Sequence, residues 1–188
     1  MLNTVLGSFS SGVAAATASY ESIASATGTG SSATITFSAI PATYTHLQVR
    51  YNARDAAALN AEVVVLRFNG VTGTSYASHA LQGNGSTATT VQTASANGIN
   101  RNFQIASANA TANIMGVGII DILDYASTTK TKTIKAIAGV DLNSATTDAQ
   151  IRLSSGLFNS TNAITSISFV APANFTTSTT FALYGIKG

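Results

Sequence analysis

The sequence predicts an all-β fold, an antiparallel β-sandwich of two sheets with a jelly-roll-like form. Apolar and polar residues alternate with a period of two along most of the 188 residues, as they do in strands that bury one face. Clusters of Gly, Asn, Ser and Thr separate these short runs at the spacing that is typical of sandwiches and jelly rolls. The sequence shows no convincing helical pattern, so strands are expected throughout.

The N-terminal part of the chain predicts three strands. Residues 13–26 are the only Ala-rich stretch long enough for a helix, but the Thr and Ser residues within it compete for backbone hydrogen bonds. We therefore expect a first strand at residues 20–26, with a short helix as the alternative. Residues 34–38 alternate as a second strand, which Pro41 ends. Residues 46–51 alternate in the same way and predict a third strand with its polar side chains outward.

The middle of the chain predicts one covered strand and then a long loop region. Residues 62–68 form a nearly continuous apolar run rich in β-branched residues, which is typical of a central strand covered on both faces. The dipeptide Asn69-Gly70 predicts a tight turn after it. Between residues 76 and 113 the pattern weakens, and only residues 99–105 alternate clearly, so this stretch is expected to hold the long loops.

The strongest strand prediction falls at residues 113–124, whose apolar run indicates the most buried strand of the chain. Residues 131–140 follow it, with Thr133, Lys135 and Ile137 on the face opposite to the apolar set. The short connection between the two predicts a hairpin. Further strands are expected at residues 151–153, 164–170 and 180–186, which brings the total to about ten.

These strands predict a single domain at residues 19–188, preceded by an N-terminal arm at residues 1–18. The arm lacks the basic residues and the uninterrupted apolar stretch of a secretory signal peptide. The apolar runs of the chain are too short to span a membrane. The residues expected to form the core are Phe37, Leu47, Val49, Leu66, Phe68, Ile120, Ile122, Ile134, Ile151, Leu153, Ile167, Phe169 and Leu183.

Charge is scarce in this chain, because only 9% of its residues are charged and its formal net charge is +2. A polar but nearly uncharged surface suits packing against copies of the chain or a larger assembly. Lys130, Lys132 and Lys135 form the only basic cluster and are expected as alternate lysines on the outer face of one strand, which argues against nucleic acid binding. The arginines are few enough that each is expected to have a partner: Arg50, Arg54, Arg67 and Arg101.

Candidate catalytic and metal-binding residues are sparse, and we expect no enzyme, no cofactor and no metal. The absence of cysteine excludes disulfides, thiolate catalysis and thiolate metal ligands. His46 and His79 are the only histidines and are expected on a strand face or in a loop. Asp121 and Asp124 would point to opposite faces of a strand, so they do not form a carboxylate pair, and Asp124 is expected to cap a turn. The remaining acidic cluster misses the calcium-loop spacing and indicates turns: Asp141, Asn143 and Asp148.

Several distinctive runs of the chain remain, namely SYESIA (19–24), TITFSAIPATYTHLQVR (34–50), LRFNGVTGTSY (66–76), IIDILDYASTTKTKTIKAIAG (119–139), SGLFNSTNAITSI (155–167) and FALYGIKG (181–188). Together they resemble a family of small virion proteins that are encoded by tailed bacteriophages, many of them from marine and freshwater hosts. The resemblance covers residues 19–188 and supplies no catalytic residues.

This resemblance implies a structural role in the phage particle, on the head or on the tail, for a protein made in the bacterial cytoplasm. One compact domain with a short arm, and no coiled-coil heptads of a fibre shaft, favours a capsid decoration or cement protein. Its expected partners are copies of itself, in a homotrimer, and the major capsid protein. The alternative is a tail-associated protein that recognises a host-surface glycan or receptor through loops at residues 76–97 and 159–162.

Overall fold

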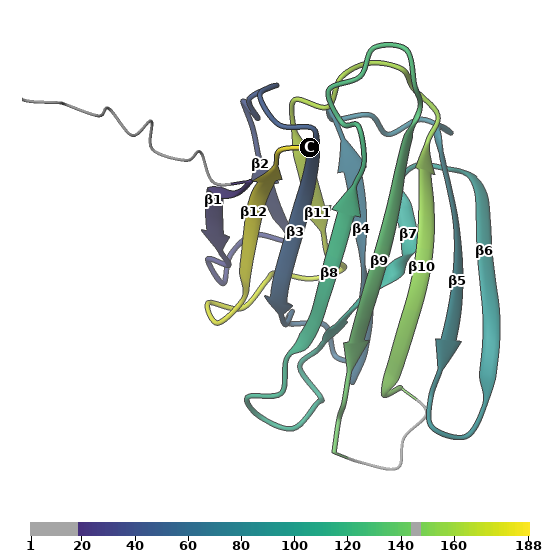
Figure 1. Ribbon diagram of the computed structural model, residues 1–188. Coiled ribbons are helices and arrows are strands. Elements are labelled where there is room, and N and C mark those ends of the chain that lie inside the picture. Colours follow the sequence, from purple (N-terminus) through teal and green to yellow (C-terminus); the bar gives the residue numbers. More distant parts are fainter. Residues whose placement is uncertain (1–18, 144–147) are drawn as a thin grey trace, which may run out of the picture.

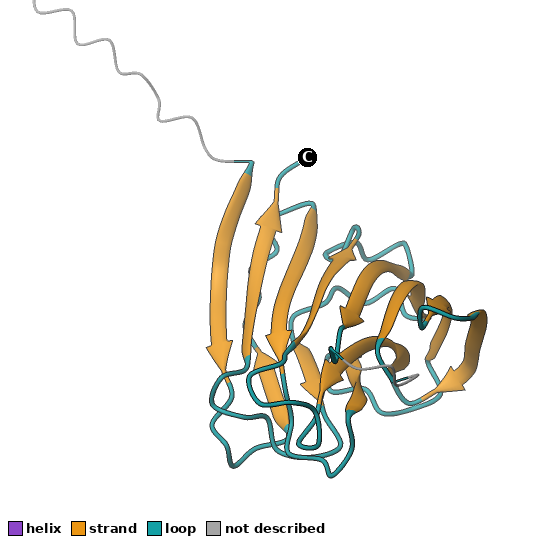
Figure 2. Ribbon diagram, turned by 90° about the horizontal axis from the view of Figure 1, so that it is seen from below, coloured by secondary structure: helices purple, strands orange, loops and turns teal. Residues whose placement is uncertain are grey.

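The computed structural model describes residues 19–143 and 148–188, and within them it contains strands and no helix (Figure 1). The strands form two antiparallel sheets that pack as a β-sandwich, so the predicted fold class is confirmed. The predicted arm at residues 1–18 lies outside the described residues. The view from below shows the strand directions turning from one side of the molecule to the other (Figure 2), as expected for a wide sheet with the usual strand twist.

Twelve strands make up the described part of the chain, in place of the ten or so expected. They are β1 (Tyr20–Thr27), β2 (Thr34–Phe37), β3 (His46–Ala53), β4 (Ala61–Phe68), β5 (Tyr76–Gly83), β6 (Ala88–Ala96), β7 (Ile99–Ala106), β8 (Gly116–Ile122), β9 (Lys132–Val140), β10 (Gln150–Phe158), β11 (Ile167–Val170) and β12 (Thr180–Ile186).

The large sheet has eight strands in the order β1-β12-β3-β8-β9-β10-β5-β6, and the small sheet has four in the order β2-β11-β4-β7. From β1 to β5 the chain crosses between the sheets at every connection, and it does so again from β6 to β7, β7 to β8, β10 to β11 and β11 to β12. The hairpins β5–β6 and β9–β10 instead stay within the large sheet and extend it beyond β8 (Figure 1). On the inner side of this extension, β7 packs against β9, β10 and β5.

The core lies between the sheets and follows the predicted alternation. In β3, Leu47, Val49 and Tyr51 are buried while the residues between them face outward. Aromatic rings fill the space at one end, where Phe181 stacks on Phe169 with ring centroids 4.5 Å apart. Burying each large apolar side chain contributes about 1.5–3 kcal/mol, so this alternation supplies much of the folding free energy.

The prediction that Ile151 and Leu153 belong to the core is wrong, because these residues are 64% and 52% exposed. The predicted core residues that the structure confirms as buried are Phe37, Leu47, Val49, Leu66, Phe68, Ile120, Ile122, Ile134, Ile167, Phe169 and Leu183. Ile151 and Leu153 occupy alternate positions of β10 on the face that points away from the small sheet.

The expected loop region at residues 76–113 is wrong in part, since it holds β5 and β6 in addition to β7, which matches the alternation seen at residues 99–105. Strand β6 lies at an edge of the large sheet and is exposed along most of its length, so its Thr, Gln and Ser residues need no apolar partners. Strand β7 is buried on nearly every residue, because the large-sheet extension covers it. Edge exposure removes from β6 the alternation by which strands are recognised in a sequence.

Strand β8 was expected to be the most buried strand and is not. Val117 and Ile119 are 54% and 42% exposed, and Leu123 after the strand is 45% exposed. Strand β4 was expected to be covered on both faces, yet Val63 and Val65 on its outer side are only half-buried. In both strands an apolar run predicted that other elements would pack against both faces. In the described part of the chain, they pack against one face only.

Several local predictions are confirmed. Residues 20–26 form a strand and no helix, and the connection between β8 and β9 is a hairpin. Asn69 and Gly70 adopt positive φ angles of 53° and 66°, as a tight turn of this sequence requires. The Asn69 side chain also accepts a hydrogen bond from the backbone N–H of Thr165 at 2.8 Å, which ties the turn to the chain before β11.

Candidate interaction surface

The large sheet presents apolar side chains to the outside along one row that crosses four neighbouring strands. Ile119 of β8 pairs with Ile137 of β9, which pairs with Leu153 of β10, which in turn pairs with Leu81 of β5. These four side chains therefore lie side by side on the same face of the sheet. We call the row, together with two exposed neighbours on the same face, the apolar face: Leu81, Val117, Ile119, Ile137, Ile151 and Leu153.

The sequence produces this face because β8 and β9 carry apolar residues on both faces of the sheet, and β10 carries Ile151 and Leu153 on its outer face. Ile120 of β8 and Ile134 of β9 point inward and are buried, while Ile119 and Ile137 point outward. The six side chains of the apolar face are between 42% and 64% exposed. Contiguous exposed apolar patches of this kind mark contact sites on soluble proteins more often than isolated exposed residues do.

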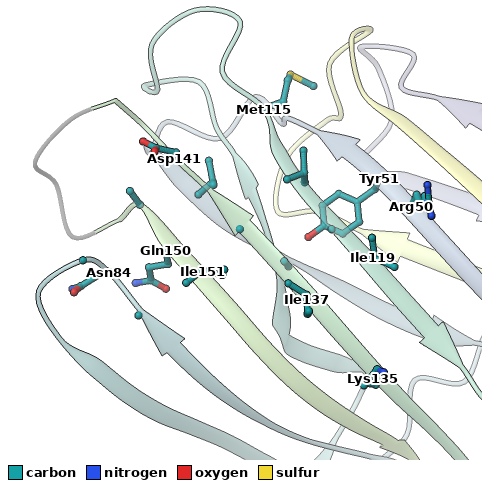
Figure 3. A pocket seen from close by; sticks show the side chains of 18 of the residues that line it. Arg50, Tyr51, Asn84, Met115, Ile119, Lys135, Ile137, Asp141, Gln150 and Ile151 are labelled. Atoms are coloured by element: carbon teal, nitrogen blue, oxygen red, sulfur yellow. The ribbon is translucent and has the colours of Figure 1, made fainter.

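The apolar face borders a groove of about 1150 Å³. Val117, Ile119, Ile137 and Ile151 lie along the groove, as the close view shows for the three labelled isoleucines (Figure 3). Loops close one end of it, and they contribute Asn84, Met115 and Asp141 among others. A second hollow of about 660 Å³ is lined by Leu81 and Leu153 among others, so the apolar row contributes residues to both hollows.

Charged groups at the groove are paired or held by neighbours. Asp121 lies on the row next to the apolar one, where its carboxylate is 3.8 Å from the ammonium of Lys135. The side-chain amide of Gln48 donates to the same carboxylate at 2.8 Å. These contacts leave a rim without excess charge of either sign.

An aromatic pair lies farther along the sheet, toward β1. Tyr20 and Tyr184 stack with ring centroids 4.8 Å apart, and the guanidinium of Arg50 lies 5.9 Å and 6.0 Å from the two centroids. Arg50 also donates to the amide oxygen of Gln48 at 3.1 Å. Burial raises the pKa of Tyr20, and Arg50 counteracts part of that effect, so the phenol stays protonated at neutral pH.

Neither histidine belongs to a catalytic arrangement in the described residues. His46 lies at the start of β3, and its Nδ1 accepts the backbone N–H of Asp124 at 3.0 Å. Because Nδ1 is an acceptor in this bond, the 3.6 Å approach of the Asp124 carboxylate is not an ion pair. His79 lies on the exposed face of β5, opposite Gln92 and Ser155. The two histidines are thus on a strand face, as expected.

The acidic candidates serve turns and sheet contacts. Asp124 lies in the turn after β8, and a 2.6 Å hydrogen bond from Lys130 lowers the pKa of its carboxyl. Asp121 stays on the outer face of β8, whereas Asp124 lies beyond the end of that strand, so the expected opposite placement on one strand does not apply. Asp141 accepts the backbone N–H of Asn143, and Asp148 accepts the amide of Asn60. The described residues contain no group of three or more His, Asp or Glu that could hold a metal ion.

One lysine is not where the sequence placed it. Lys132 was expected on the outer face of β9 with its neighbours, but its side chain is fully buried on the inner face. Its ammonium donates to three backbone carbonyls, those of Ser127, Lys130 and Thr161, at 2.7, 2.7 and 3.1 Å. Lys135 does lie on the outer face. The basic cluster is therefore divided between the two faces of the sheet.

The four arginines singled out in the sequence have partners within the chain, as expected. Arg54 donates to the carbonyls of Ala108, Ala110, Thr111 and Ile114 and so holds the loop between β7 and β8. Arg67 donates to the carbonyl of Asn97, Arg101 to the hydroxyl of Thr93, and Arg50 to Gln48. These partners are carbonyls, a hydroxyl and an amide.

The apolar face itself escaped sequence reasoning. Ile151 and Leu153 were assigned to the core, and Leu81 fell in the expected loop region. A usable signal was present, because β10 places Ile151 and Leu153 opposite in parity to Arg152 and Ser154. Inward-facing polar residues and outward-facing apolar ones invert the usual pattern of a half-exposed strand.

Comparison with known proteins yields no family model, no curated protein and no solved structure that matches the chain. Among the described residues there is also no helix long and apolar enough to cross a membrane. We therefore infer a function from the apolar face and its groove.

Proposed function

We propose that this protein is a structural component of a tailed-bacteriophage particle and acts by contact, most specifically as a capsid decoration or cement protein. The observation that carries the proposal is the apolar face, six half-exposed aliphatic side chains aligned across four strands. A surface of this kind is stable in water when a partner covers it. It supplies binding energy and holds no group that performs chemistry.

The strand order supports a jelly roll, the form expected from the sequence. Strands β1-β12-β3-β8 face β2-β11-β4-β7, which is the arrangement of two four-stranded sheets wound together. The hairpins β5–β6 and β9–β10 are additions to the larger of these sheets. Jelly rolls are frequent in viral capsid proteins and in lectins. The added hairpins carry four of the six apolar-face residues, so the extension of the fold and the contact surface coincide.

The scarcity of charge supports the same proposal. A decoration protein has to bury several patches, against its own copies and against the major capsid protein, and each unpaired charge in such a patch costs desolvation free energy. The location in the virion belongs to this proposal, which does not depend on the expected homotrimer. No enzymatic activity is part of it.

The test is the copy number of the chain in purified particles, measured by quantitative mass spectrometry against the major capsid protein. A copy number comparable with that of the capsid protein supports decoration. A handful of copies per particle supports a place on the tail. If the chain is absent from purified DNA-filled particles, the proposal is wrong.

A second candidate is the tail-associated protein that recognises a host-surface glycan. The stacked Tyr20 and Tyr184 rings lie beside the polar groups of Gln48, Arg50 and Asp121, which could hydrogen-bond sugar hydroxyls. The loop region first expected at residues 76–97 consists mostly of strands, which leaves residues 159–162 of the two expected loops. Loss of binding to host cells in Tyr184→Ala, with Tyr44→Ala as control, would favour this candidate.

A further inference from the structure

We infer that the partner covering the apolar face is a second copy of this chain, seated face to face in a two-fold pair. The inference rests on the proposal that the protein acts by contact, and it specifies one such contact, between the apolar faces of two copies. It concerns the outer face of β8, β9, β10 and β5 and leaves the small sheet free for other partners of the assembly.

Charge at the surface favours a copy of the same chain. The charged residues that line the groove are Arg50, Lys135, Asp121 and Asp141, which are two cations and two anions. A strongly acidic or basic partner would therefore meet no excess of opposite charge at the groove. Two copies related by a two-fold axis meet without net repulsion, and the Asp121–Lys135 pair of each copy offers both signs to the other.

The exposed area is large enough for such a pair. Aliphatic side chains that are about half exposed present roughly 80 Å² each, so the six together present on the order of 500 Å² per copy. Burial on both copies removes about 1,000 Å² from water, which reaches the lower bound for a specific interface before the polar rim is counted. The face is thus sufficient for a dimer of moderate affinity.

The placement of the face favours two-fold symmetry. One patch that pairs with itself gives an isologous dimer, whereas a three-fold ring requires two different complementary patches. Ile137 lies on β9, between Ile119 of β8 and Leu153 of β10 and thus inside the row. Sheets that pack face to face interdigitate their side chains at a separation of about 10 Å, so Ile137 of each copy is expected near the two-fold axis.

The first experiment measures the mass of the full chain in solution by light scattering over a concentration series. The expected mass is that of two chains, and Ile137→Glu is expected to shift it to that of one chain at the same concentrations. Leu59→Glu is the matched control, since Leu59 is 51% exposed against 54% for Ile137 and lies outside the apolar face. Circular dichroism establishes that each variant is folded.

The second experiment places a unique thiol at the interface. The chain contains no cysteine, so Ile137→Cys creates a single reactive site. A short bismaleimide is expected to join two Ile137→Cys chains covalently and to leave Leu59→Cys chains single. This readout does not depend on a destabilising substitution, because Cys is small and apolar.

Each other result overturns the pairing. A monomer at all concentrations, or a mass of three chains, contradicts the two-fold pair. If the full chain is monomeric and deletion of residues 1–18 makes it dimeric, the arm and not a second copy covers the face. The particle measurement stays separate: a monomer found in many copies per particle would refute the pairing alone, and a dimer absent from particles would refute the proposed function alone.

Discussion

The ring of Tyr51 lies directly over Gly118, so that a Cβ atom at position 118 would come within 2.4 Å of the ring. The same phenol donates to the backbone carbonyl of Gln104 at 3.0 Å and so connects β3 of the large sheet to β7 of the small one. Burial raises the pKa of Tyr51 far above its usual range, so the phenol stays protonated and remains a donor at neutral pH. The glycine thus makes room for a buried link between the sheets.

Replacing Gly118 should therefore weaken the sandwich. Gly118→Val is expected to lower the free energy of unfolding by about 1–3 kcal/mol, because the ring must move and its hydrogen bond is strained. Urea denaturation followed by circular dichroism measures the change. Gly73→Ala is the control, since a Cβ atom at Gly73 meets no atom within 4 Å. Equal stabilities of the two variants would refute this account.

The buried Lys132 should be required for stability through its hydrogen bonds. Lys132→Met keeps most of the apolar stem but leaves the carbonyls of Ser127, Lys130 and Thr161 without their donor. We expect a loss of about 2–4 kcal/mol in the free energy of unfolding, since a buried unpaired polar group costs about 1–3 kcal/mol. Lys135→Met, on the exposed face, should change it by less than about 1 kcal/mol.

Lys132 also predicts the sign of a pH effect. Burial lowers the pKa of its ammonium below the value of the unfolded chain. Between the two pKa values the unfolded chain binds more protons, so the contribution of this group to stability rises with pH in that window. Thermal unfolding of the native chain and of Lys132→Met across alkaline pH should differ in slope, with the native chain showing the more positive slope.

At the other end of the pH scale, Glu21 should contribute to acid sensitivity. Hydrogen bonds from Lys187 at 2.6 Å and from Tyr44 at 3.0 Å lower the pKa of its carboxyl below 4.5 and tie β1 to the C-terminus. The stabilisation is present above the unfolded pKa and is lost as pH falls through the folded one. Glu21→Gln should flatten the fall of melting temperature below about pH 4.5.

The matched control for that measurement is Glu62→Gln. The Glu62 carboxylate accepts a hydrogen bond from the adjacent backbone N–H of Val63 and takes part in none of the ion pairs found in the described residues. Its melting curve should follow the native one through the acid range. If Glu21→Gln also follows the native curve, the contact with Lys187 contributes nothing to the acid response.

Strands with clear alternation or a long apolar run could be predicted from the sequence, and β5 and β6, which fell in the expected loop region, could not. Leu47 and Val49 alternate with polar neighbours, so their burial followed directly. Ile151 and Leu153 are also apolar, and only their alternation with Arg152 and Ser154 indicated that their face is the outer one. Lys132 was predicted on the outer face and is buried. Its burial depends on three carbonyls, from residues 127, 130 and 161, which come together only in the folded chain and leave no signal in the sequence.

The same distinction applies to the candidate site. Composition led us to expect a protein that works by contact, and His46 and His79 lie on strand faces, where the sequence analysis placed them. The contact surface itself depends on register: Ile119, Ile137 and Leu153 form a row only because β8, β9 and β10 pair as they do. Shifting one of these strands by a single residue would turn its row inward.

Arg54 offers a last prediction, which separates the shape of a side chain from its charge. Its guanidinium donates to four carbonyls between residues 108 and 114, and a lysine has the same charge but cannot reach four acceptors in a plane. Arg54→Lys should therefore speed amide hydrogen exchange in residues 107–115 by at least about tenfold, equivalent to about 1.4 kcal/mol of local stability. Arg67→Lys, which loses a single bond to Asn97, should leave this loop unchanged. Unchanged exchange in Arg54→Lys would mean that the loop is held by its own turns, such as the hydrogen bond from the Ala110 amide to the Ser107 carbonyl, and not by the arginine.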